Sequence, residues 1–405
     1  MLAPALAERV PVSLAGGRLA LYVIANAAIW AAALAPVLVT LPLRVEELAP
    51  DSTSGSLSLI LGVGGVVALT SPALGWLSDG ARRRTGSRRP ALLGGMVIAF
   101  AGALLLAEAD AIADLLVGWC VTQVGVNVVI VSLMAVLVDA VPPPRRGVVS
   151  GLLGVGPPIG AVMGTWLLEA VSDSPRQLFL APTVLAAIAV GLFALVLPSA
   201  RPRPKPEPRL AGPAPATDLQ ALRWAWLSRL AFFFGVVIIG NYQALFLIDD
   251  LGRPPDDVPR LMAVATLLNT TFVIAASLIT GRGTDRIGRR KPFLLGAGLT
   301  FAVGATVLVT ADSYALFLVA VSINGLALGA YAAVDLALIT DLLRSREGVA
   351  AKDLGVFKLA NALPQVLAPA VASVALIQGY PALFAVAAAC AVLAAFTITR
   401  VRGVA

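Results

Sequence analysis

The sequence contains no histidine, only two cysteines and few charged residues, which make up 13% of its 405 positions. Without histidine there is no imidazole to ligate a metal or to carry protons near neutral pH. Cys120 and Cys390 lie within apolar runs, where a thiol behaves as a small hydrophobic group, and they give no disulfide framework. The sequence also lacks paired catalytic carboxylates and a nucleotide-binding loop of the form G-x-x-x-x-G-K-[ST]. We therefore expect no enzymatic activity, no cofactor and no ATP-driven motor, with a polytopic membrane enzyme or scaffold as the alternative.

The sequence is instead rich in hydrophobic residues, which form long apolar runs. Hydrophobic residues make up 59% and the mean hydropathy is +0.90, whereas soluble domains are about 45–50% apolar. Apolar runs of about twenty residues, long enough to cross a membrane as helices, recur along the chain, and β-barrel strands would be about half as long. The sequence predicts an all-α membrane protein. Its twelve transmembrane helices are expected near residues 19–42, 54–78, 90–107, 115–141, 148–170, 178–198, 222–248, 259–281, 292–311, 314–342, 354–377 and 381–400.

Basic residues are concentrated on one side of these predicted helices. Of the 30 Lys and Arg residues, only Arg44, Arg176, Arg253 and Arg260 fall on the other side. The positive-inside rule places both termini and the long central loop in the cytosol. The first 18 residues do not resemble a cleaved signal peptide and are expected to be a short cytosolic tail. The sequence thus predicts a protein of a bacterial-type inner membrane or a plasma membrane, and its basic pI reflects topology rather than nucleic-acid binding.

A Pro- and Arg-rich segment, PSARPRPKPEPRLAGPAPATD at 198–218, divides the chain. Alternating prolines and basic residues cannot form a continuous helix, so a solvated linker is expected; attraction to anionic lipid head groups is an alternative. The predicted domains are an N-terminal six-helix bundle at 1–198, a cytosolic linker at 199–221 and a C-terminal six-helix bundle at 222–405.

A short cassette occurs once in each half. It reads GWLSDGARRRTGSRRP at 75–90 and GRGTDRIGRRKP at 281–292, each between two apolar runs. The segments 137–160 and 339–365 also correspond, because each begins at an acidic helix end and continues through a basic turn into a helix with Pro. The two halves therefore indicate a duplicated hydrophobic module, a common design of secondary transporters.

This pattern resembles the major facilitator superfamily over essentially the whole chain. The signature loop of that family reads Gly-x-Leu-Ser/Ala-Asp-Arg-x-Gly-Arg-Arg. The first cassette matches it at Gly75, Leu77, Ser78, Asp79, Gly86, Arg88 and Arg89, with Gly80 in place of Arg and four extra residues, and the second at Gly281, Asp285, Arg286, Gly288, Arg289 and Arg290. The resemblance implies two pseudo-symmetric six-helix bundles and a small-molecule solute moved across the lipid bilayer by alternating access. We expect a monomer.

The cassettes are expected to act as gates at the cytosolic rim. Asp79 should face the start of helix 11 near 352–353, where the helix dipole favours a carboxylate, and the arginines should pair with carboxylates at helix ends. The alternative is that the arginines only anchor the topology. The predicted gating residues are Gly75, Asp79, Gly86, Arg88, Arg89, Asp139, Arg146, Gly281, Asp285, Arg289, Arg290 and Asp341.

Asp335 is predicted to couple transport to protons. It lies about 9 Å inside the cytosolic end of helix 10, where an ionisable group is costly and commonly faces a cavity or a partner. Lys358, at a similar depth in helix 11, is the expected partner. The alternative is that Lys358 reaches to the membrane interface and Asp335 is a structural brace.

Neutral polar residues in the spans are candidates for solute binding, because the resemblance places their helices around a central cavity. They are Asn26, Trp30, Gln123, Asn127, Asn241, Tyr242, Gln243, Asn324, Asn361 and Gln365. Taken singly, each could instead form an interhelical hydrogen bond. The set favours a neutral polar or amphiphilic solute, and no basic residue is predicted near the midplane to bind an anion.

Two features point to different subgroups of the family. The long first cassette and the KDLG…NALPQ segment at 352–365 are similar to the glycoside–pentoside–hexuronide:cation symporters and the sucrose-transporter group. The GPPIG segment at 156–160 is instead close to the Gly-Pro-x-x-Gly element of proton-driven drug exporters. The first hypothesis is therefore a proton-coupled symporter of a sugar-like solute. The alternative is a proton-antiporting exporter of drugs or amphiphilic metabolites.

Overall fold

The computed structural model describes residues 16–142, 145–171, 174–197, 219–287, 289–343 and 350–401, and in these ranges the regular structure is helical. The α-helices of the first half are α1 (Gly17–Ala35), α2 (Leu41–Leu48), α3 (Thr53–Leu69), α4 (Ser71–Thr85), α5 (Arg89–Ala107), α6 (Ile112–Ala140), α7 (Arg146–Gly154), α8 (Gly156–Ala170) and α9 (Pro175–Val196). Those of the second half are α10 (Leu219–Asp249), α11 (Val258–Ile287), α12 (Lys291–Val309), α13 (Tyr314–Leu343), α14 (Ala350–Ala375) and α15 (Tyr380–Thr399).

Twelve helical segments within the described residues are long and apolar enough to cross a membrane, which confirms the predicted number. The first span runs through α1, a π-helical turn at Pro36–Thr40 and α2, and is therefore longer than the sequence pattern predicted. The fifth span is interrupted at Val155, between α7 and α8. The glycine before this break and the Gly-Pro-Pro run after it explain the break, since proline lacks the N–H that continues a helix.

The second predicted span, 54–78, differs from the structure. The membrane-crossing helix α3 ends at Leu69, and the separate helix α4 begins at Ser71 with Pro72 in its first turn. α4 ends at Thr85 and is capped by Gly86, whose φ of 71° is left-handed and whose N–H donates to the Arg82 carbonyl at 2.8 Å. A glycine is favoured at this capping position because a side chain would strain the left-handed backbone.

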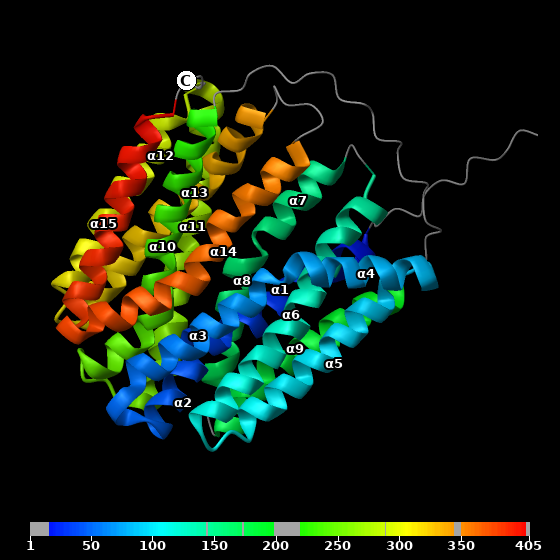
Figure 1. Cartoon of the computed structure of the whole chain (residues 1–405), viewed down its shortest axis with the longest axis horizontal. Coiled ribbons are helices and arrows are strands. Elements are labelled where there is room, and N and C mark those ends of the chain that lie inside the picture. The colour runs from blue at the N-terminus through cyan, green and yellow to red at the C-terminus, as the bar shows by residue number, and fades with distance from the viewer. Residues whose placement is uncertain are drawn as a thin grey trace, which may run out of the picture.

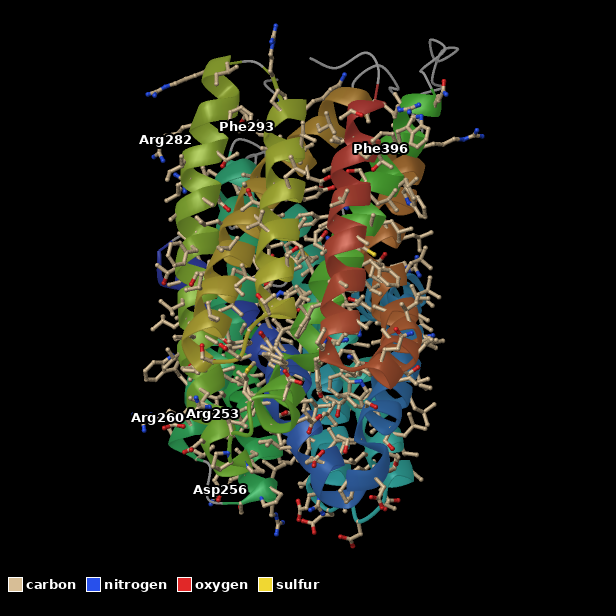
Figure 2. All side chains as sticks on the ribbon, turned by 90° about the vertical axis from the view of Figure 1, so that its left-hand side faces the viewer. Arg253, Asp256, Arg260, Arg282, Phe293 and Phe396 are labelled. Atoms are coloured by element: carbon tan, nitrogen blue, oxygen red, sulfur yellow. The ribbon has the colours of Figure 1, made fainter. Side chains whose placement is uncertain are left out.

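The bundle has two ends of different charge. We call the end that holds the junctions α4–α5 and α11–α12 the basic face, because it carries the arginines of both cassettes, and the end that holds α2 the opposite face. Figure 1 shows α2 at the lower end of the molecule and α7 toward the upper end. In Figure 2, Arg253, Asp256 and Arg260 lie at the lower end, whereas Arg282 lies toward the upper end, so α11 runs from the opposite face to the basic face.

The helices form two groups. Figure 1 shows α10, α11, α12, α13 and α15 on one side and α4, α5, α6 and α9 on the other, with α3, α8 and α14 between them. The groups meet where α14 packs on α3 and where α11 packs on α8. Each group has its own aromatic contact in the core: Tyr22 stacks on Phe193 in the first half and Phe232 on Tyr331 in the second. The predicted linker at 199–221 falls almost wholly outside the described residues, so this domain boundary stays a prediction.

Candidate functional site

A cavity of about 530 Å³ lies at mid-depth between the two halves. This volume is within the range of small-molecule sites. The first half contributes residues around Leu34 and the α7–α8 break, and the second half contributes residues of α10, α11, α12 and α13. Residues of both halves therefore line the same cavity.

The cavity lining is mostly apolar, and its polar side chains are neutral. Six polar residues line it: Gln243, Thr266, Asn269, Thr270, Ser277 and Asn324. Four of them are on α11, where Asn269, Thr270 and Ser277 follow Thr266 by three, four and eleven residues, spacings that place side chains on one helix face. The second half thus presents a row of amide and hydroxyl groups to an otherwise hydrocarbon space.

Several of these polar groups already have partners. The Asn269 amide donates to the Val321 carbonyl at 2.8 Å, and the Ser277 hydroxyl donates to the Gly329 carbonyl at 2.9 Å. The Thr270 hydroxyl donates to the Pro158 carbonyl of the other half at 3.3 Å. Asn324 differs, because it is 4% exposed and neither side-chain atom has a hydrogen-bond partner in the described part of the structure. A buried amide without partners is costly unless another molecule supplies them.

Of the ten predicted solute-binding residues, Gln243 and Asn324 line this cavity. Others hold helices together. The Asn26 amide donates to the Leu153 carbonyl at 3.0 Å, and the Tyr242 hydroxyl bonds to that of Ser58 at 2.5 Å. The remaining positions do not belong to the lining set: Trp30 and Asn361 are partly buried, Asn241 is buried, Gln365 is exposed, and Asn127 donates to the Gln123 side chain at 3.2 Å. None of the predicted solute-binding residues is on α11, although the spacing of the Thr, Asn and Ser residues of this helix is a usable signal.

Asp335 has a partner that the sequence analysis did not predict. Its carboxylate forms an ion pair with the Arg229 guanidinium, whose Nε also donates to the Asn361 side-chain oxygen at 2.7 Å. The side chains are 9% and 14% exposed, respectively. The positive-inside count grouped Arg229 with the basic residues of the cytosolic side, although it lies ten residues inside α10. The predicted partner, Lys358, has a side chain outside the described residues.

The ion pair adjoins the cavity. The Arg229 Cζ atom lies 5.6 Å from the ring centroid of Phe233, one helical turn along α10. Phe233 and Ala332, which is three residues from Asp335, both line the cavity. Because Asn361 is on α14, the group joins three helices at the basic-face end of the solute space.

A second ion-pair cluster lies at the basic face. Arg88 is 6% exposed and contacts three partners: Asp139 at 2.6 Å, Asp79 at 2.8 Å and the Ser78 hydroxyl at 2.9 Å. Arg82 also binds Asp139, at 2.8 Å. The cluster therefore ties the first cassette to the end of α6 within the first half. The arginines have the expected carboxylate partners, whereas the gating role of the cluster stays a prediction.

The other predicted gating residues are not all brought together. Arg89 donates to the Leu197 carbonyl at 3.0 Å, and Gly75 approaches Val131 of α6 closely. In the second cassette, Gly281 has open space where a side chain would lie, Arg289 is exposed and Arg290 is partly buried. The side chains of Arg146, Asp285 and Asp341 lie outside the described residues. Asp79 is the half-exposed member of its cluster, and its predicted contact near 352–353 stays a prediction, because the side chains of those two residues lie outside the described part.

Close contacts join the halves from the opposite face to mid-depth. The Ser58–Tyr242 hydrogen bond links α3 to α10, near the opposite-face ends of both helices. Farther in, α3 approaches α14 so closely at Gly65 that an added methyl would lie 2.6 Å from the Gln365 carbonyl oxygen. The cavity is therefore covered on the opposite-face side by direct contact between the halves.

Twelve membrane-spanning helices in two groups, with a shared cavity at mid-depth, define a polytopic membrane transporter. The chain belongs to the Major Facilitator Superfamily, whose family model matches residues 19–269 and 225–403. It is thus a transporter and not an enzyme. No curated relative matches the sequence.

Solved structures of the same fold cover nearly the whole chain. A nucleoside transporter, NupG, is 13% identical, with a TM-score of 0.73 over 95% of this chain and 99% of that one. The inward-open xylose transporter XylE of E. coli is 14% identical, with a TM-score of 0.72 over 96% and 97%. A peptide transporter, POT, is 14% identical, with a TM-score of 0.74 over 96% of each chain. At this level of identity the likeness concerns the fold.

Proposed function

We propose that this protein is a secondary active transporter that carries a small amphiphilic solute through the central cavity by alternating access, coupled to protons at Asp335. The observation that carries the proposal is the shared cavity itself, walled by both halves and covered toward the opposite face. One chain supplies both walls, which favours a monomer as the working unit.

The orientation follows from charge. The positive-inside rule assigns the basic face, and with it both termini, to the cytosol. The contacts described between the halves lie at mid-depth and toward the opposite face, and the Asp79 side chain is 54% exposed at the basic face. These features support an inward-facing state, in which closure of the basic face would bring Asp79 and its cluster against the second half.

The lining favours an amphiphilic solute over a sugar. A sugar carries many hydroxyls that need partners once water is removed, whereas most of this lining is aliphatic or aromatic. The sugar-like solute is kept as the second candidate, because α11 presents a row of polar groups and one solved structure of this fold is a D-xylose–proton symporter.

Asp335 is the proposed coupling group because it is an ionisable side chain beside the solute space and within the membrane-spanning part of α13. An acidic group at such depth is a common proton relay in pumps and transporters. Protonation would break its ion pair with Arg229 and change how α10, α13 and α14 are held together.

Flux measurements in proteoliposomes test this proposal. A screen of amphiphilic compounds and sugars by thermal shift would first identify a ligand, and an imposed pH gradient should then drive its accumulation. Asp335→Asn should abolish gradient-driven accumulation but preserve part of the solute exchange. Asp312→Asn, which alters an exposed carboxylate near the other end of α13, should leave accumulation intact. Equal accumulation by the wild type and Asp335→Asn would remove Asp335 from coupling.

A further inference from the structure

Arg229 places a buried cation next to a largely apolar cavity. Its guanidinium packs beside Phe233, a cavity wall, and is held by Asp335 and Asn361. The absence of a basic residue near the midplane argued against an anionic solute, but Arg229, closer to the basic face, adjoins the cavity through Phe233. A cavity with hydrocarbon walls and a guanidinium at one end matches a molecule with an apolar body and one acidic head.

We propose that the solute is an amphiphilic organic monocarboxylate, and that its carboxylate replaces that of Asp335 on Arg229 once Asp335 is protonated. This inference rests on the proposed transport function and names the substrate class of the same site. Asp335 takes one proton from water on the side of solute entry, and its ion pair with Arg229 breaks. The solute carboxylate then forms two hydrogen bonds with the guanidinium. Release reverses both steps, so one proton accompanies each anion.

Charge balance makes the exchange obligatory. In the structure the buried group contains one guanidinium and one carboxylate, and its net charge is zero. Binding a second carboxylate while Asp335 is ionised would leave a net negative charge in a poorly solvated place, and protonating Asp335 alone would leave Arg229 unpaired. Only the combination of a proton and an anion restores a neutral group, so each should favour the binding of the other.

The geometry of Arg229 suits this exchange. Its Nε is occupied by Asn361, which fixes the plane of the guanidinium, and Asp335 binds at Nη1. A guanidinium offers parallel N–H groups that match the two oxygens of a carboxylate. Asn361 is thus a positioning residue that holds Arg229 while its acidic partner changes.

The surroundings of Asp335 supply no other described counter-ion at its carboxylate. On its own helix Tyr331 is one turn away, and from α10 Ser228 faces the same region. From α11, Arg282 lies on the outer surface in Figure 2 and donates to the Leu278 carbonyl. From α12, Lys291 begins the helix at the basic face, and the Lys358 side chain of α14 lies outside the described residues. Arg229 therefore dominates the electrostatic environment of Asp335.

Binding measurements on the full chain in nanodiscs test the proposal. The probes are octanoate, 4-phenylbutyrate and benzoate, each compared with its primary amide, which has the same shape but no charge. Asp335→Asn mimics the protonated carboxyl. At pH 7.5 it should bind at least one of these acids about tenfold more tightly than the wild type, the value of one charge-assisted hydrogen bond. The wild type should approach the affinity of the variant as the pH falls to 5.5.

A double variant supplies the folding control. Arg229→Gln alone would leave Asp335 buried without a cation and could unfold the protein, whereas Arg229→Gln with Asp335→Asn keeps a neutral, hydrogen-bonding pair. This double variant should bind acids and amides equally. Retention of a preference for acids would overturn the proposal, as would equal binding of acid and amide by Asp335→Asn or a failure of all three acids to bind it.

Flux separates this proposal from the transport function. With a bound acid, the uptake that exceeds passive entry of the acid into protein-free liposomes should respond to a pH gradient but not to a membrane potential set by potassium and valinomycin, because the proton and the anion together carry no charge. Accumulation of the amides without the acids would disprove the carboxylate proposal and leave transport standing. If no ligand found in the screen moves, the transport function itself fails.

Discussion

Tyr242 donates a hydrogen bond of 2.5 Å to the hydroxyl oxygen of Ser58, and this bond joins the two halves of the protein. The direction is set because the Ser58 hydroxyl already donates to the Ser54 carbonyl at 2.6 Å. Both side chains are buried, at 0% and 6% exposure. Opening of the opposite face has to break this bond, so it contributes to the stability of the state described here.

Tyr242→Phe should therefore favour opening of the opposite face. The net value of such a bond is about 1 kcal/mol, which corresponds to a roughly fivefold change in the population ratio. The measurement is the rate at which a thiol reagent modifies a cysteine placed at Ser54, in a background where Cys120 and Cys390 are replaced by Ala. The rate should rise about fivefold.

Tyr314→Phe is the matched control for this variant. The Tyr314 hydroxyl donates to the Leu261 carbonyl at 2.7 Å, also toward the opposite face but within the second half. Its loss should lower stability by a similar amount without changing the modification rate. Equal rates in all three proteins would show that the Ser58–Tyr242 bond does not hold the halves together.

Glycine at position 65 allows α3 and α14 to touch. A methyl at Gly65 would lie 2.6 Å from the Gln365 carbonyl oxygen, whereas one at Gly62, on the same helix, would lie 3.7 Å from the Val366 carbonyl oxygen. Gly65→Ala should force the backbones apart and lower the free energy of unfolding by about 1–3 kcal/mol. Gly62→Ala should be nearly neutral. Thermal unfolding in detergent compares the two, and similar melting temperatures would contradict the close approach.

Arg88 should be more important for stability than the other arginines of its loop. Arg88→Gln would leave Asp139, whose side chain is 17% exposed, with Arg82 as its only cation partner among the described residues. Removing one partner from a buried pair costs about 3–5 kcal/mol, and the partial exposure of the carboxylates places the expected loss near the lower value. The control is Arg83→Gln, since Arg83 is exposed. A similar melting temperature for both variants would count against a structural role for the Arg88 cluster.

The transmembrane architecture could be predicted from the sequence because hydropathy is a local property. Each membrane span can be recognised from its apolar run, and the duplicated cassette marks corresponding positions in the two halves. The breaks were harder to predict. The junctions at Thr70 and Val155 fall inside runs that remain apolar, and only the prolines that follow them signal a change of direction.

The ion pair of Asp335 could not be assigned in this way. Its partner Arg229 lies more than a hundred residues away in the sequence, and Asn361, which binds Arg229, lies about twenty-five residues away on the other side. The pairing depends on how three helices are rotated about their axes. The positive-inside count grouped Arg229 with the cytosolic basic residues because the count uses the charge of a residue and not its depth in the membrane. A single arginine followed by twenty largely apolar residues was the signal that it overlooked.

Most of the predicted solute-binding residues do not line the cavity, for a related reason. A polar residue in a membrane helix is equally well accommodated by a neighbouring helix or by a cavity. Asn26 and Asn324 look alike in the sequence, but the first donates to the Leu153 carbonyl, whereas the second lines the cavity. Only the packing of the helices separates these roles.

Asn324 offers a test that separates binding from stability. Its amide is 4% exposed and has no partner among the described residues, so Asn324→Leu removes an unsatisfied polar group while keeping a similar volume. The ligand-free protein should become more stable by about 1–3 kcal/mol. The side-chain oxygen lies beside Gly304 of α12 in the ligand-free state, so the amide has to turn toward the cavity to bond to the solute, and its loss should then lower solute affinity about tenfold.

Asn269→Leu should instead lower the stability of the ligand-free protein. The Asn269 amide donates to the Val321 carbonyl at 2.8 Å, and its removal leaves that carbonyl unpaired. Thermal unfolding of both variants, with and without a solute found in the screen, gives the comparison. A lower melting temperature for ligand-free Asn324→Leu would mean that the amide stabilises the empty cavity. Asn324 would then be a structural residue, because an unpaired polar group that serves only to bind a ligand destabilises the ligand-free protein.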